Sequence, residues 1–169
     1  MSKSKVPTSH EQPIEVQTLT EGTIEPPGED IGLVVVLPVY YVTKFKTKKD
    51  KTILVNLNTL FTSHYHTRNK IKQHYNAYII ALLTSMQPAK ITGKYEIGIR
   101  YFYKNIRSDL DNIASAMAKL FLDAAQAYGL VEEDNINHCV RITAEVGDRD
   151  KDNPRVEVFI RKIKETNDN

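Results

Sequence analysis

Acidic side chains lie on both sides of one predicted helix, at spacings that could serve metal chemistry. Asp109 and Asp111 flank the predicted start of this helix, Lys119 lies partway along it, and Asp134 follows its end. Asp109 falls at the cap and Asp111 in the first turn, so both carboxylates can approach one point near the positive end of the helix. Like charges this close need a cation or a proton to neutralise them. The cluster therefore suggests a Mg²⁺ site.

The same residues also fit ordinary helix capping. Ser108 and Asp111 match the S-x-x-D capping box, in which both side chains satisfy backbone N–H groups at the helix start. On spacing alone, capping is the favoured interpretation and a metal site is the alternative.

Two other polar clusters are poor matches to known metal sites. His64 and His66 could point the same way on an extended chain, but a zinc site needs further histidine or cysteine ligands nearby. Residues 148–153 place Asp at three ligand positions of a calcium loop, yet Asn153 stands where glycine is needed and Phe159 where glutamate is needed. Surface histidines and a polar hairpin turn are the simpler interpretations.

Composition indicates an ordinary soluble protein. The chain has 169 residues, of which 41% are hydrophobic and 26% charged, and it has no apolar run long enough to span a bilayer. Its lone Cys139 fits a reducing compartment, and the sequence starts without a secretory signal pattern. We expect a cytoplasmic protein without a membrane partner.

Charge is distributed unevenly along the chain. Residues 1–30 carry six acidic side chains and two lysines, a local charge of −4. Because the whole chain has a net charge of +2, the remaining residues carry a net charge of +6. This segment is predicted to be a disordered acidic arm, and residues 164–169 a disordered tail. A basic body around an acidic cluster suits a partner with a phosphate backbone.

The hydrophobic pattern predicts an α+β fold in a single compact domain over residues 31–163. We expect a mixed sheet with two main helices on one side, in the order β-β-α-β-α-β-β. Strands are predicted over 33–42, 52–57, 92–103, 136–146 and 155–163, and helices from Thr67 to just before Pro88 and over 110–128. Pro38 implies a bulge or a sheet edge, because proline cannot donate to a strand ladder.

Basic residues gather in a lysine-rich segment, at the start of the first helix and near the acidic motif. Positive charge in the first turns of a helix has the wrong sign for the helix dipole, which favours a phosphate partner. The candidate DNA contacts are Lys46, Lys48, Lys49, Arg68, Lys70, Lys72, Arg100 and Arg107.

Three segments occur in an order that resembles the RusA family of Holliday-junction resolvases. That family has a D-x-D-N motif, a helix with a lysine and an L-D-A segment, then a glycine and a late acidic pair ending in Asp. The matching segments are Asp109-Leu110-Asp111-Asn112, Leu122-Asp123-Ala124 and Gly129-Leu130-Val131-Glu132-Glu133-Asp134. The match is most specific over residues 107–135.

The resemblance implies a Mg²⁺-dependent endonuclease that resolves four-way DNA junctions by paired nicks. Asp109, Asp111 and Asp134 would be both the metal ligands and catalytic groups, Lys119 would be a further catalytic residue, and Mn²⁺ could replace Mg²⁺. A two-fold homodimer that binds branched DNA is implied as well. The alanine-rich helix and the tyrosine-rich strand before it are its candidate interface.

The position of the lysine departs from the family pattern. The family lysine comes four residues after the second Asp, where this chain has Ser115, whereas Lys119 lies four residues before Asp123. An insertion of four residues, about one helical turn, reconciles the two spacings. The alternatives are a non-catalytic module of the same fold that binds branched DNA, and a structural or interaction protein whose acids only cap a helix.

Overall fold

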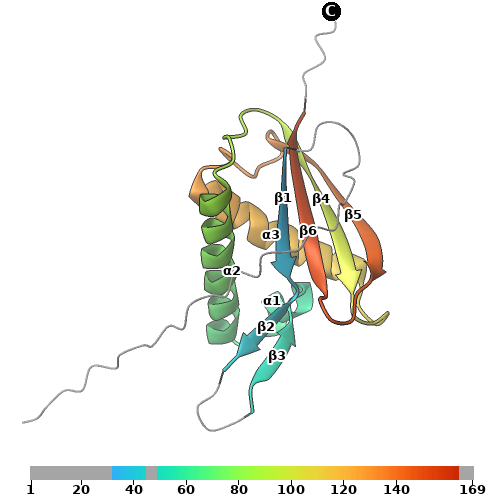
Figure 1. Ribbon diagram of the computed structural model, residues 1–169. Coiled ribbons are helices and arrows are strands. Elements are labelled where there is room, and N and C mark those ends of the chain that lie inside the picture. The colour runs from blue at the N-terminus through green and yellow to red at the C-terminus, as the bar shows by residue number, and fades with distance from the viewer. Residues whose placement is uncertain (1–31, 45–48, 164–169) are drawn as a thin grey trace, which may run out of the picture.

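Four strands form one mixed sheet in the computed structural model, which describes residues 32–44 and 49–163 (Figure 1). In spatial order they are β1 (Leu33–Pro38), β6 (Arg155–Lys162), β4 (Tyr95–Tyr103) and β5 (Cys139–Arg149). β5 runs parallel to β4, and the other neighbouring strands are antiparallel. The predicted mixed sheet and α+β class are confirmed. The predicted arm at 1–30 and tail at 164–169 lie outside the described residues.

Two long helices cover one face of this sheet. They are α2 (Tyr65–Met86) and α3 (Leu110–Tyr128), and in Figure 1 α3 crosses behind the strands. Alternate strand residues such as Ile99 and Val158 are buried against helix residues such as Leu83 and Phe121. The helix expected over 110–128 is therefore confirmed, and so is the alternation that turns one face of β4 toward the core.

Most of α3 is buried, which changes one prediction. Ten of its 19 residues are buried, among them Ala114, Ala118 and Ala124. On β4, Tyr95 and Tyr101 are buried in the same core. The alanine-rich helix and the tyrosine-rich strand are thus core elements of one chain, and their prediction as a dimer interface was wrong.

The predicted strand over 33–42 is divided into two strands that belong to different sheets. β1 ends at Pro38, and β2 (Tyr40–Thr43) then pairs with β3 (Lys51–Leu54) in a separate two-stranded sheet. β1 lies at the edge of the main sheet, as predicted from its proline. The Pro38 carbonyl accepts a hydrogen bond from the Tyr75 hydroxyl of α2, which ties this corner to the helix.

A short helix, α1 (Leu57–Thr62), occupies a segment that was predicted to be irregular. Its cap is Asn56, whose side chain accepts a hydrogen bond of 2.8 Å from the Thr59 backbone N–H. α2 starts at Tyr65 with His64 as its cap, two residues before the predicted start. In the described part of the chain, none of the helices is long and apolar enough to cross a membrane.

β5 begins three residues later than predicted, because Asn135 holds a turn. The Asn135 side-chain oxygen accepts a hydrogen bond of 3.0 Å from the Asn137 backbone N–H, and its carbonyl oxygen accepts one of 3.0 Å from the His138 backbone N–H. Residues 135–138 are therefore held as a turn between α3 and β5.

Gly129 ends α3 with φ of 87°, and its N–H donates to the carbonyls of Ala125 and Gln126. We predict that Gly129→Ala lowers the free energy of unfolding by about 1–2 kcal/mol, because a Cβ is disfavoured in the left-handed region. Gly93, with φ of 81° and open surroundings, is the matched position for comparison. Urea denaturation of both alanine variants should show similar losses. A neutral Gly129→Ala beside a destabilising Gly93→Ala would contradict the left-handed assignment.

Candidate functional site

Asp109 and Asp111 lie at the start of α3, where the sequence places them. Asp109 is the N-cap residue, and Asp111 is in the first turn. Among the described residues, the Asp109 side chain makes no capping hydrogen bond and instead accepts one of 3.3 Å from the Asn112 side-chain amide. The helix starts one residue later than a capping box headed by Ser108 requires. Capping therefore does not account for the Asp109 carboxylate.

Lys119 joins two other carboxylates on the exposed face of α3. Its Nζ lies 2.7 Å from Asp123 Oδ1 and 3.2 Å from Asp134 Oδ2. The hydrogen bond to Asp123, with a further one to Asp134, raises the pKa of Lys119 despite its partial burial. The Lys119 side chain is thus held as a cation, so it can supply positive charge but cannot act as a base.

The chain after α3 turns back along the helix and brings Asp134 to Lys119. The Glu132 carbonyl, which follows the turn at Gly129, accepts a hydrogen bond of 3.5 Å from the Gln126 side-chain amide of α3. The hydroxyl of Tyr95, whose pKa is raised by burial, donates to the Glu133 carbonyl at 2.8 Å. These contacts at two successive residues position the backbone just before Asp134.

The exposed side of α3 carries a polar stripe, which we define as Asp111, Ser115, Lys119 and Asp123. Its members are four residues apart, so each step is about 6 Å along the helix axis. Asp111 and Lys119 are therefore about 12 Å apart along the helix axis. Asp134 contacts Lys119 and so lies about two turns from Asp111. Among residues 32–44 and 49–163, no group of three or more His, Cys, Asp or Glu side chains is placed to hold a metal ion. The structure does not gather the three predicted ligands.

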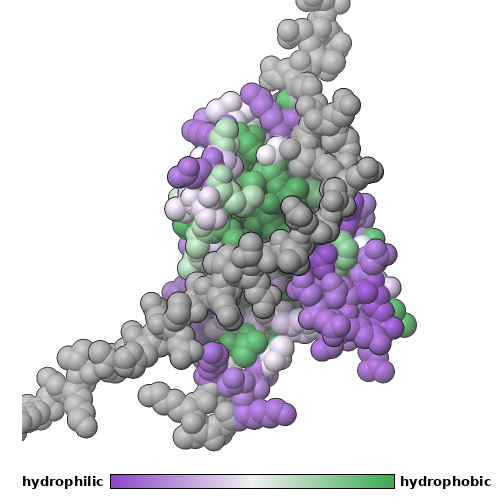
Figure 2. Space-filling view, in the orientation of Figure 1, coloured by the Kyte–Doolittle hydropathy of each residue, from purple (hydrophilic) through white to green (hydrophobic). Residues whose placement is uncertain are grey.

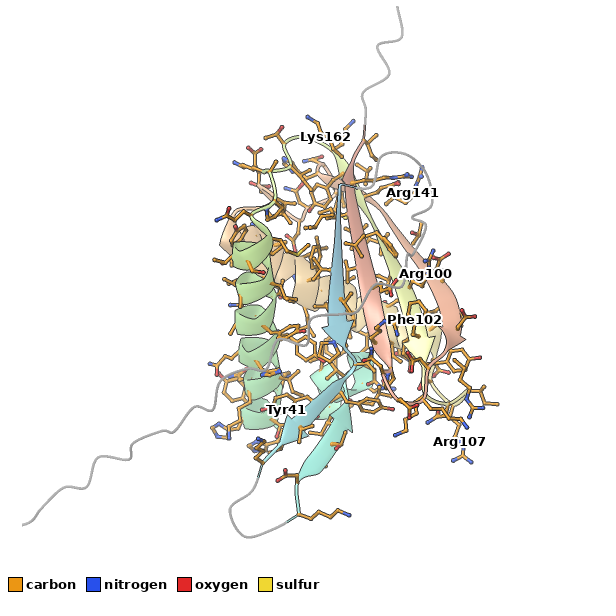
Figure 3. All side chains as sticks on the ribbon, viewed as in Figure 1. Tyr41, Arg100, Phe102, Arg107, Arg141 and Lys162 are labelled. Carbon is orange, nitrogen blue, oxygen red and sulfur yellow. The ribbon has the colours of Figure 1, made fainter. Side chains whose placement is uncertain are left out.

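The predicted DNA contacts lie on different parts of the surface. Arg68, Lys70 and Lys72 are at the start of α2, and Arg68 lies over the Tyr65 ring, with Cζ 5.7 Å from the ring centroid. Arg107 is exposed in the loop that joins β4 to α3, as Figure 3 shows. Lys49 is exposed beside β3, whereas Lys46 and Lys48 lie outside the described residues.

Arg100 is on the sheet face opposite the helices. Its Nε lies 2.5 Å from Glu145 Oε1, and its guanidinium carbon lies 5.1 Å from the centroid of the Phe159 ring (Figure 3). Figure 2 shows this side of the molecule, where hydrophilic residues gather over the lower ends of the strands. Because a carboxylate already pairs with it, Arg100 is less suited to a phosphate contact than Arg107.

Comparison with models of known protein families gave no match, and comparison with curated protein sequences gave none. The function therefore has to be argued from the residues.

Asp123 is a member of the cluster that sequence reasoning left out of the site. Its ion pair with Lys119 follows the i, i+4 spacing of a helix, so the spacing could have indicated it. Asp134 could be placed only once the turn at Gly129 was known.

We predict that Lys119→Ala changes the free energy of unfolding by less than about 1 kcal/mol, because exposed ion pairs are weak in water. Lys90→Ala, which removes the exposed pair with Glu132, is the matched control. Urea denaturation of the two variants should give similar small effects. A loss above about 2 kcal/mol for Lys119→Ala alone would show that the cluster is mainly structural.

Proposed function

We propose that this protein is a Mg²⁺-dependent endonuclease that cuts branched DNA, with four-way junctions as its substrate. The observation that carries the proposal is the contact of Lys119 with Asp134. It brings the late acid of the motif beside the polar stripe at Lys119, one helical turn beyond Ser115, the position where the family has its lysine. On this proposal the helix is one turn longer than the RusA pattern requires, and its lysine is displaced by the same turn.

The residues fit a two-carboxylate site better than a three-carboxylate site. Mg²⁺ is commonly held by one or two carboxylates together with substrate phosphates, and Asp109 and Asp111 supply such a pair at an exposed helix start. Asp134 is paired with Lys119 about two helical turns away. When bound, the ion would neutralise phosphate charge and lower the pKa of a water. Asp109 and Asp111 would hold it.

Lys119 is suited to stabilise negative charge on the scissile phosphate. Asp123 and Asp134 keep it protonated and fix the direction of its Nζ. A DNA phosphate that reached this point could replace one carboxylate as hydrogen-bond acceptor. Asp134 would then be released and could accept a proton from water.

A non-catalytic module that binds branched DNA is the second candidate. The observation that favours it is the separation of Asp134 from Asp109 and Asp111, which leaves the predicted metal ligands in two groups. A module of this kind would use Arg107 and the basic start of α2 for phosphate contacts.

We predict that the wild type places symmetric nicks in a synthetic four-way junction with Mg²⁺, and that EDTA abolishes them. Asp111→Asn should slow cleavage by at least about 100-fold, because it removes a charge that the ion requires. Asp152→Asn, in the exposed turn between β5 and β6, is the control and should cut normally. Binding without cleavage, unaffected by metal, would support the non-catalytic module. Absence of binding at low salt would contradict both candidates.

A two-fold dimer suits a junction cut at two symmetric points, and the edge strand β5 is its candidate interface. In the described chain β5 pairs only with β4, and Ile142 and Val146 are more than half exposed. If β5 paired antiparallel with itself about Thr143, Arg141 would lie opposite the partner subunit's Glu145. Val140 would lie opposite the partner subunit's Val146. Long apolar edges are usually covered in native proteins.

We predict that Ile142→Lys converts a dimer into a monomer, because it places a charge in the apolar row of the paired strands. Ile136→Lys, at an exposed position before β5, should remain dimeric. Sedimentation velocity distinguishes the two species. A monomeric wild type, or a dimeric Ile142→Lys variant, would contradict the β5 interface.

A further inference from the structure

We infer that the corner formed by β3, α1 and the start of α2 binds unpaired nucleotides of single-stranded DNA. None of the residues of this corner belongs to the polar stripe of α3. The inference extends the proposed function, because it names how strands near a branch point would be held, and its test needs neither metal nor cleavage.

The basic charge of this corner favours a polyanion as its ligand. Residues 51–72, which form β3, α1 and the start of α2, contain four lysine or arginine residues and no Asp or Glu, a local charge of +4 in a chain whose total is +2. Arg68, Lys70 and Lys72 stand in the first two turns of α2, where the helix dipole is also positive. The described structure gives this helix no acid in its first turn. A polyanion would relieve this repulsion.

Two aromatic side chains of this corner are exposed to solvent. Phe61 at the end of α1 is 72% exposed, and Tyr65 at the start of α2 is 59% exposed. The ring of His66 lies 5.3 Å from that of His64 and 5.8 Å from that of Tyr65, between centroids. Rings in contact with water gain free energy when a base stacks on them.

A polar groove lies between β3 and α1. Its volume is about 560 Å³, and its lining includes Lys51, Asn58, Ser63, His64 and Thr67. Hydroxyl, amide, imidazole and ammonium groups are the partners that sugar and phosphate oxygens use in proteins. The groove begins at β3, which lies at the same end of the molecule as the start of α2 (Figure 1). His64 belongs both to the groove and to the aromatic group.

The rings distinguish single strands from duplex DNA. In a duplex the bases are stacked inside the helix, so exposed side-chain rings meet only the backbone and the groove edges. In a single strand the bases are free to stack on Phe61 and Tyr65 while the backbone follows the basic start of α2. Charge alone would bind both forms, so the rings are what make unpaired nucleotides the preferred ligand.

The test is fluorescence anisotropy with the full-length protein and a labelled oligothymidine of about 12 nucleotides, in EDTA. Phe61→Ala and Tyr65→Ala should each weaken binding by about 5- to 150-fold, the range expected for the loss of one stacked base. Tyr65→Phe, which keeps the ring, should restore most of the affinity. Ile106→Ala and Ile136→Ala, both at positions 87% exposed and outside this corner, should bind like the wild type.

Salt dependence separates charge from stacking. Arg68→Ala should reduce the slope of log K against log salt by about 0.7, the value for one phosphate contact on a single strand. Phe61→Ala should leave that slope unchanged. Wild-type affinity in both Phe61→Ala and Tyr65→Ala would overturn the inference, and so would equal affinity for a duplex of the same length. Either result would leave the cleavage proposal untouched, because that proposal is tested by nicking of a junction.

Discussion

The burial of α3 against the sheet and α2 is the constraint on which the rest of the molecule depends. Ten of the 19 residues of α3 are buried, including Met117 and Phe121 with almost no exposed surface. A helix buried to this extent has one narrow side left for charged groups. The polar stripe occupies that side. The polar side chains of the stripe are therefore arranged in a row, about 6 Å apart along the helix axis, and do not converge on one point.

The connection from α3 to β5 completes this arrangement. β4, α3 and β5 form a strand–helix–strand unit with parallel strands, in which α3 carries the chain back to the end of the sheet where β5 starts. Leu130 and Val131 are buried on the way, and Val131 forms a bridge with Ile91. Asp134 then reaches Lys119 because the preceding backbone is fixed, so the ion pair follows from the packing.

Elements with a single clear hydrophobic period could be predicted from the sequence. The bounds of α3 and the buried face of β4 could be predicted from the three- and four-residue and the alternating patterns. Those patterns could not tell a core face from a dimer face, because both bury apolar residues, and so the alanines of α3 were misassigned. The break between β1 and β2 is tied to α2 through the Pro38 carbonyl, and the short helix α1 starts at the Asn56 cap. Both are single contacts without a periodic signal.

Candidate site residues could be proposed from the sequence, whereas their arrangement depends on the fold. Spacing predicted that Asp109 and Asp111 share one helix end, and α3 does start between them. It could not show that Asp134 joins Lys119, because that contact depends on the helix length and on the return of the chain after Gly129. The exposed rings of Phe61 and Tyr65 were missed because their exposure depends on the short helix α1, which the hydrophobic pattern did not predict.

The central claim is that Lys119 supplies the positive charge that the family's lysine provides, although the family places that lysine at the position of Ser115. The most direct measurement is the single-turnover rate of four-way junction cleavage for Lys119→Ala and Ser115→Ala, at saturating protein and Mg²⁺. We predict a loss of about 100-fold or more for Lys119→Ala and a rate close to that of the wild type for Ser115→Ala. Normal cleavage by Lys119→Ala together with a large loss for Ser115→Ala would contradict it.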